Sequence, residues 1–61
     1  MGNSYRIDRI YNLLLQRNSA TVEELAQYFH VTPTTIRRDL LELEDRKLIF
    51  RNRGSALLLY R

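Results

Sequence analysis

Two helix-start signals stand close together in the middle of this chain and limit its fold more than any other feature. Thr21 and Glu24 have the spacing of a capping box, in which each side chain hydrogen-bonds the backbone N–H of the other residue at the start of a helix. Thr32 can cap another helix, with Pro33 at the first helical position, where the missing N–H costs nothing. The first of these helices must therefore end near Phe29, and only a short turn separates it from the second.

Apolar residues recur at helical spacing in three segments, near residues 4–17, 22–29 and 33–46. The side chains on their inward stripes are Ile7, Ile10, Tyr11, Leu14, Val22, Leu25, Ala26, Phe29, Ile36, Leu40 and Leu43. Leu13 lies off the stripe of the first segment, so we expect it to be exposed. Two helices joined by a short turn, the second capped and basic at its start, are typical of a helix-turn-helix domain.

The last part of the chain changes period and gains β-forming residues. It predicts two short strands, near residues 48–51 and 56–60, and a reversal over residues 52–55 around a glycine. A strand can bury only one face, so we expect Leu58 and Tyr60 to be covered by a further domain or a dimer partner. The predicted fold class is mainly α with a small β-hairpin (α+β), a winged helix-turn-helix of three helices and a two-stranded wing.

Length and composition allow one small domain. The chain has 61 residues, 44% of them hydrophobic, and no cysteine, so an apolar core must stabilise it without disulfides or thiolate-bound zinc. The longest apolar run has five residues, from Ala56 to Tyr60, far below the ~20 that a membrane helix needs. The polar N-terminal stretch has no signal-peptide pattern, so we expect a cytoplasmic domain with no membrane partner.

Charge is distributed unevenly along the chain. Residues 1–20 carry three arginines and one acid, residues 21–45 two arginines and six acids, and residues 46–61 five cations and no acid. The net charges of these segments are +2, −4 and +5, which give the +3 of the whole chain. Arg37 and Arg38 are the only cations of the acidic segment, and arginine is the residue that forks onto phosphate and guanine.

The two arginines and the acids take different positions on the third predicted helix. With a rotation of about 100° per residue, Thr34, Arg38 and Leu41 point away from the core. Arg37 lies on one flank, while Asp39 leans back toward the body, where it can pair with a cation of the first or second helix. The other acids of this helix lie on its last turns. A recognition helix contacts base edges with its first turns, so the arginine pair is predicted to meet DNA.

The chain resembles the N-terminal DNA-binding part of the DeoR family of bacterial transcriptional regulators, through the segment TVEELAQYFHVTPTTIRRDLLELEDRKLIFRNRGSA. The TIRRDL motif of that family stands intact at residues 35–40, and its Arg-x-His-Gly-Gly-Ala wing corresponds to residues 51–56. Three positions depart from the family pattern: Lys47 stands for a glycine, Arg53 for the wing histidine and Ser55 for the second wing glycine.

The resemblance implies that residues 1–61 are a winged helix-turn-helix DNA-binding domain excised from a longer regulator. A C-terminal effector domain, which this chain does not include, would sense a sugar phosphate. The intact protein would be a homo-oligomer and would repress a sugar or carbohydrate operon. The resemblance also implies that Lys47 holds the left-handed helix end where the family has glycine, at a cost of ~1 kcal/mol.

We expect seven residues to bind double-stranded DNA: Thr32, Thr34, Thr35, Arg37, Arg38, Arg51 and Arg53. Arg38 is predicted to contact guanine in the major groove, and Arg37 to reach a phosphate. The hydroxyls of the first helical turn can hydrogen-bond phosphate, and Arg53 at the wing tip can meet a phosphate or enter the minor groove. The alternative for these cations is a solvated surface that contacts nothing.

No catalytic, cofactor or metal site is predicted. His30 is the only histidine, and we expect it to be a turn residue that is partly buried or hydrogen-bonded. Glu42, Glu44 and Asp45 spread around the helix as surface charge. We therefore expect a protein that is not an enzyme. The alternative function is a winged-helix protein–protein interaction module without specific DNA binding, for which an outward apolar residue such as Leu41 would be suited.

Overall fold

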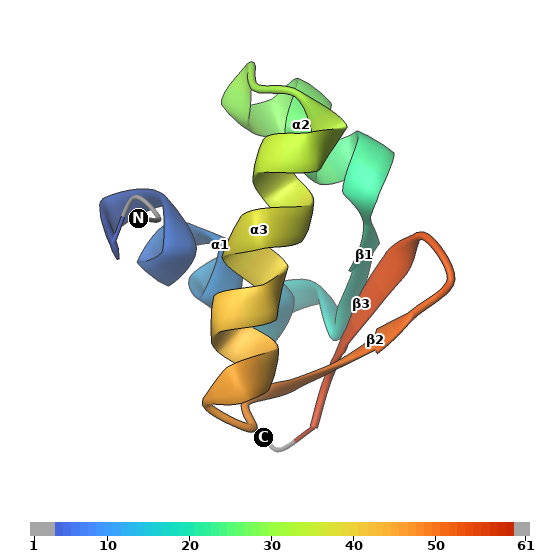
Figure 1. Ribbon diagram of the computed structural model, residues 1–61. Coiled ribbons are helices and arrows are strands. Elements are labelled where there is room, and N and C mark those ends of the chain that lie inside the picture. The colour runs from blue at the N-terminus through green and yellow to red at the C-terminus, as the bar shows by residue number, and fades with distance from the viewer. Residues whose placement is uncertain (1–3, 60–61) are drawn as a thin grey trace.

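The computed structural model describes residues 4–59, which form three helices and one small sheet. The helices are α1 (Ser4–Arg17), α2 (Val22–Phe29) and α3 (Pro33–Asp45), and the strands are β1 (Ser19–Thr21), β2 (Ile49–Asn52) and β3 (Ser55–Leu58). Figure 1 shows α3 at the centre, α2 above it and the β2–β3 hairpin projecting to one side. The predicted winged helix-turn-helix fold is confirmed, with helix bounds within one residue of those expected.

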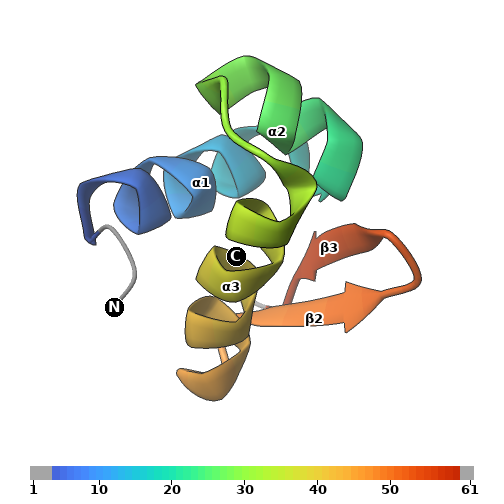
Figure 2. The same cartoon turned by 45° about the horizontal axis from the view of Figure 1, so that its top comes forward.

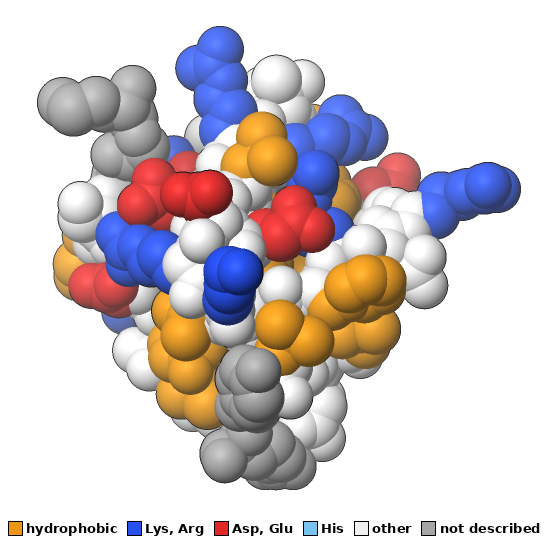
Figure 3. Space-filling model, turned by 60° about the horizontal axis from the view of Figure 1, so that its bottom comes forward, with side chains coloured by type: hydrophobic (Ala, Val, Ile, Leu, Met, Phe, Trp, Pro, Cys, Tyr) orange, Lys and Arg blue, Asp and Glu red, His pale blue; other side chains and the backbone are white. Residues whose placement is uncertain are grey.

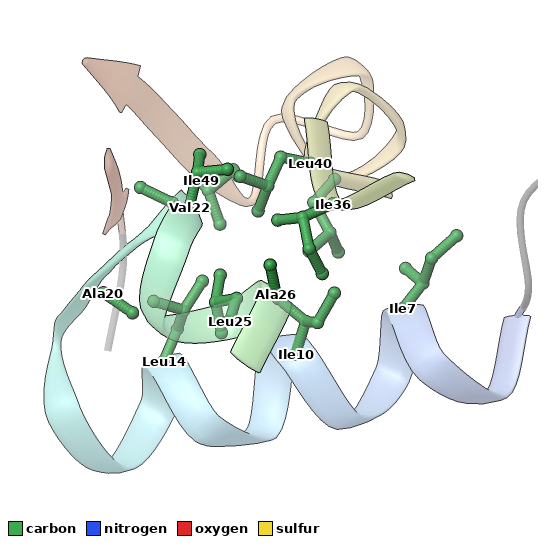
Figure 4. Close-up of a cluster of buried hydrophobic side chains, with 12 residues drawn as sticks. Ile7, Ile10, Leu14, Ala20, Val22, Leu25, Ala26, Ile36, Leu40 and Ile49 are labelled. Atoms are coloured by element: carbon green, nitrogen blue, oxygen red, sulfur yellow. The ribbon is translucent and has the colours of Figure 1, made fainter. Parts of the chain in front are cut away.

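One apolar core joins the helices to the sheet (Figure 4). Its buried side chains are Ile7, Ile10, Leu14, Ala20, Val22, Leu25, Ala26, Ile36, Leu40, Leu43, Ile49 and Ala56. They come from the inward stripes that the helical periodicity predicts, together with one residue from each strand. Full burial of a leucine or isoleucine contributes about 1.5–3 kcal/mol, so this cluster is the main source of stability in a chain without cysteine.

The starts of α2 and α3 are capped as the sequence predicts. The backbone N–H of Glu24 donates to Thr21 Oγ1 over 3.0 Å, and the backbone N–H of Thr21 donates to Glu24 Oε1 over 3.0 Å. That second bond lowers the pKa of Glu24, with smaller contributions from the Thr21 side chain and the Arg17 charge. At α3, Thr32 is the N-cap and Pro33 is the first helical residue. The Thr21 cap fixes where α2 begins, and the Thr32 cap fixes where the turn between α2 and α3 ends.

All three helices end in the left-handed conformation at a residue other than glycine. Asn18, His30 and Lys47 have φ angles of 72°, 58° and 63°. After His30 the N–H of Val31 donates to Ala26 O over 3.0 Å, and after Lys47 the N–H of Leu48 donates to Leu43 O over 3.1 Å. The predicted positive φ of Lys47 is therefore confirmed. His30 is the expected turn residue, but its side chain is exposed and not partly buried as expected.

The sheet has the order β1-β3-β2, with both pairings antiparallel. The wing hairpin β2–β3 is the one predicted, while the third strand β1 was not expected. Ser19 pairs with Leu57, so the short segment between α1 and α2 closes onto the end of the hairpin. Figure 2 shows from a second direction how the hairpin extends beside α3 and away from the helices.

Two expectations about exposed side chains are wrong. Leu58 packs against the core, because it shares the inner face of β3 with Ala56, and Leu57 and Leu59 are the exposed leucines instead. Leu13 also packs against the core, since α2 covers that flank of α1. Tyr60, which was grouped with Leu58, lies outside the described residues.

Candidate DNA interface

The orientation of α3 is fixed by a buried ion pair with α1. Asp39 is 1% exposed and accepts hydrogen bonds from the Arg6 guanidinium, one from Nε and one of 3.2 Å from Nη2 to Oδ1. The predicted pairing of Asp39 with a cation of the first or second helix is thereby confirmed. Because the carboxylate lies opposite the outward stripe, this contact holds the TIRRDL segment with its two arginines facing away from the core.

Arg37 and Arg38 are both exposed on α3, as predicted from helix rotation. Neither guanidinium has a hydrogen bond or an ion pair with any part of the chain that the structure describes. Thr34, on the same outward stripe, is exposed as well. The first two turns of α3 therefore present two uncompensated positive charges and a hydroxyl to solvent.

The acids of α3 are mostly neutralised by cations of the domain itself. Glu42 accepts a 2.8 Å hydrogen bond from Arg46 Nη2, four residues later on the same surface. Glu44 accepts a 2.9 Å bond from Arg51 Nε of β2. With Asp39 paired as well, three of the four acids between residues 33 and 45 have a positive partner. The charge that remains available on the first turns of α3 is positive.

Thr32 and Thr35 form a small hydroxyl pair at the start of α3. Their Oγ1 atoms are 3.0 Å apart, and the backbone N–H of Thr35 donates to Thr32 Oγ1 over 3.3 Å. A hydroxyl pair has two protons and this contact uses one, so one O–H can still donate to a phosphate oxygen. Thr32 therefore caps the helix, and the hydroxyl pair keeps one donor free for a ligand.

The wing carries one free arginine and one that is engaged. Arg51 lies against Glu44 and is partly covered, so the wing is tied to the end of α3 through this residue. Arg53 is exposed at the tip, and no ion pair holds its side chain within residues 4–59. Its backbone N–H donates to Asn52 Oδ1 over 2.8 Å, and Gly54 with φ +72° completes the reversal.

The face in Figure 3 has its charged side chains mainly in one half and its apolar side chains in the other. Blue and red side chains are interspersed in the upper half, whereas most of the orange ones gather in the lower half. Among the described residues, no group of three or more histidine, cysteine or acidic side chains is placed to bind a metal ion. No helix within residues 4–59 has the length and apolar character needed to cross a membrane.

The charged helix and wing agree with comparisons to known proteins. The family model for the DeoR-like helix-turn-helix domain matches residues 6–61. The chain is 43% identical over 58 residues to the glycerol-3-phosphate regulon repressor of Escherichia coli K12, covering 95% of this chain and 23% of that protein. It is 40% identical over 58 residues to the transcriptional repressor GlcR of Bacillus subtilis 168, covering 95% of this chain and 22% of that repressor.

A third relative is the L-fucose operon activator of Escherichia coli K12, which is 43% identical over 56 residues, covering 92% of this chain and 23% of the activator. The chain thus spans less than a quarter of the length of these curated relatives. No solved structure matches it significantly. The family match covers nearly all of α1 and every later element, and the chain belongs to the family of DeoR-like helix-turn-helix domains.

Proposed function

We propose that this chain binds double-stranded DNA sequence-specifically through α3 and the wing. One observation carries the proposal: Arg37, Arg38 and Arg53 have no ion pair among the described residues, while three of the four α3 acids do. Unpaired arginines on an exposed helix and a hairpin tip supply the phosphate contacts that dominate affinity for DNA. A capped helix with one face exposed to solvent also has the shape that enters the major groove.

Within this proposal the site residues have different roles. Arg38, on the outward stripe, donates two hydrogen bonds to guanine O6 and N7. Arg37, on the flank, reaches a phosphate. Thr34 and the Thr32–Thr35 hydroxyl pair hydrogen-bond the phosphate backbone at the first turn. Arg53 contacts the next phosphate or the minor groove, whereas Arg51 does so only after leaving Glu44.

We further propose that the chain is one domain of a longer cytoplasmic regulator of a sugar or carbohydrate operon. The names of the relatives support this, since they refer to a glycerol-3-phosphate regulon and an L-fucose operon. Two of them are repressors and one is an activator, so repression is the better supported direction. A sugar phosphate bound by a separate effector domain, and assembly into a homo-oligomer, complete the proposal for the intact regulator.

The test of DNA binding is a titration of this chain against duplex from its own promoter region and against a scrambled duplex of the same length. Binding is measured at several salt concentrations, because each phosphate contact contributes about 0.9 to the slope of log affinity against log salt. We expect tighter binding to the promoter duplex and a steep salt slope for both duplexes. Equal, weak and salt-independent binding would contradict the proposal.

The alternative function, docking onto another protein, has one residue in its favour on α3. Leu41 is 51% exposed, but it shares the outward stripe with Thr34 and Arg38, which are polar and charged. A docking helix presents a contiguous apolar face to its partner. If the chain fails to bind duplex, pull-down with partner proteins becomes the informative experiment.

A further inference from the structure

The outward stripe of α3 holds one apolar side chain to which the proposed function gives no role. Leu41 is 51% exposed, whereas Ile36, Leu40 and Leu43 of the same helix are at most 1% exposed. It does not belong to the core cluster or to the apolar side chains packed against that cluster. Truncation of the Leu41 side chain would therefore leave the fold intact.

Leu41 lies close enough to the arginine pair for all three side chains to fit within one DNA groove. It lies one turn after the arginine pair, three residues after Arg38 and four after Arg37, so the three side chains are neighbours on one face. At about 1.5 Å per residue, the stripe from Thr34 to Leu41 is roughly 10 Å long, within the ~12 Å width of the major groove. Asp45 follows about 6 Å further along the axis, where a carboxylate can stay clear of the phosphates.

The surroundings of Leu41 argue against an apolar docking patch. Its nearest neighbours on the helix surface, one turn before and one turn after it, are Arg37, Arg38, Glu44 and Asp45. All four are charged, so Leu41 is an isolated apolar group within a charged surface. The other exposed leucines lie on other elements: Leu15 on α1, Leu57 in β3 and Leu59 directly after β3.

A leucine placed over base edges has one favourable partner. The C5-methyl group of thymine is the apolar group that the major groove presents, and the remaining edge atoms are hydrogen-bond donors and acceptors. Leucine over those polar atoms displaces their water and returns no hydrogen bond, which is unfavourable. The residue therefore discriminates between base pairs by burying or failing to bury a methyl group.

We propose that Leu41 reads the methyl group of a thymine adjacent to the base pair read by Arg38. The proposal rests on DNA binding through α3, and it extends the set of specificity residues by one apolar contact. A single buried methyl group corresponds to about a fourfold change in affinity. Leu41 thus adds a preference for thymine at one position of the binding site.

The experiment exchanges thymine for deoxyuridine, which differs only by the missing methyl group. Binding duplexes are first selected from a random pool with the 61-residue chain, and each thymine is then replaced singly. Affinities are measured for the wild-type chain, Leu41→Ala and Arg38→Ala. Leu57→Ala, the loss of an exposed leucine from the sheet, is the matched control, and thermal melting verifies that each variant is folded.

We expect one position at which deoxyuridine weakens wild-type binding about fourfold. Leu41→Ala should bind the thymine duplex about as weakly and should be indifferent to deoxyuridine there, while Arg38→Ala and Leu57→Ala keep the wild-type sensitivity. The proposal is overturned if deoxyuridine changes wild-type affinity at no thymine position. It is also overturned if Leu41→Ala keeps the wild-type sensitivity to deoxyuridine, or if this variant binds every duplex with wild-type affinity. If Arg38→Ala still loses its base preference in that case, DNA reading by α3 stands without Leu41. A wild-type chain that selects no sequence overturns both proposals.

Discussion

Lys47 shows how the conformation of one residue limits stability. Its φ of 63° lies in the left-handed region, which is unfavourable by roughly 1 kcal/mol for a residue with a side chain. We expect Lys47→Gly to raise the free energy of unfolding by roughly 0.5–1 kcal/mol, because the greater freedom of glycine in the unfolded chain offsets part of the gain. Urea unfolding measures the difference. Lys47→Ala removes the same charge but keeps the strain, so an equal gain from both variants would assign the effect to charge.

Arg38 and Arg53 allow base reading to be separated from phosphate binding. Arg38→Ala should weaken the free energy of binding to the specific site by on the order of 1–3 kcal/mol, because a bidentate guanine contact is removed. It should also relax the preference at one base pair. Arg53→Ala should weaken specific and scrambled duplex nearly alike and lower the salt slope by about one unit. Both variants are titrated across a salt series on both duplexes. The assigned roles are reversed if Arg38→Ala weakens both duplexes equally and Arg53→Ala affects only the specific one.

At the scale of elements, the Arg6–Asp39 pair is the polar contact that fixes α3 against α1. Asp39→Ala removes the buried carboxylate that accepts from the Arg6 guanidinium, and breaking a buried ion pair from one side destabilises proteins by about 3–5 kcal/mol. That is a large share of the total free energy of unfolding, which is roughly 3–9 kcal/mol for a chain of this length. Glu42→Ala is the control, since it breaks an exposed pair within α3 and should change stability by less than about 1 kcal/mol. Similar melting temperatures for the two variants would contradict this role for Asp39.

The start of α2 has a pH dependence of its own. The hydrogen bond from the Thr21 backbone lowers the pKa of Glu24 in the folded state, so below the ordinary glutamate range the unfolded chain binds more protons. Stability from this cap is present at neutral pH and is lost as the pH falls through the lowered pKa. We expect Glu24→Gln to flatten the acid limb of a plot of stability against pH. Glu23→Gln is the control, because this neighbouring acid of the first turn takes no part in the two capping-box hydrogen bonds.

The elements were predictable where local chemistry decides them. The helices follow from apolar periodicity and from caps at Thr21 and Thr32, and both signals lie within a few residues of what they determine. The strand β1 was missed because three residues are too few to show alternation and its partner β3 is far away in the chain. The face of Leu58 was assigned wrongly because three consecutive leucines show no period, and pairing beside Ala56 decides the face.

The candidate site was likewise predictable where helix geometry alone places the side chains. Helix rotation places Arg38 outward, Arg37 on a flank and Asp39 toward the body, and in the structure both arginines are exposed and Asp39 is buried. The contact between Arg51 and Glu44 could not be predicted, because it depends on how the wing folds back against the end of α3. The roles of these residues on DNA remain predictions that the variants above test.

At the scale of the whole molecule, the last strand within residues 4–59, β3, is the central strand of the sheet. Both β1 and β2 pair with β3 and not with each other, and the N–H of Leu58 also donates to Asn18 O over 2.9 Å. During synthesis the ribosome releases β1 and β2 before either strand has a partner. A nascent chain that stops after Asn52 therefore has both edge strands and no sheet, and the domain can close only when β3 has left the exit tunnel.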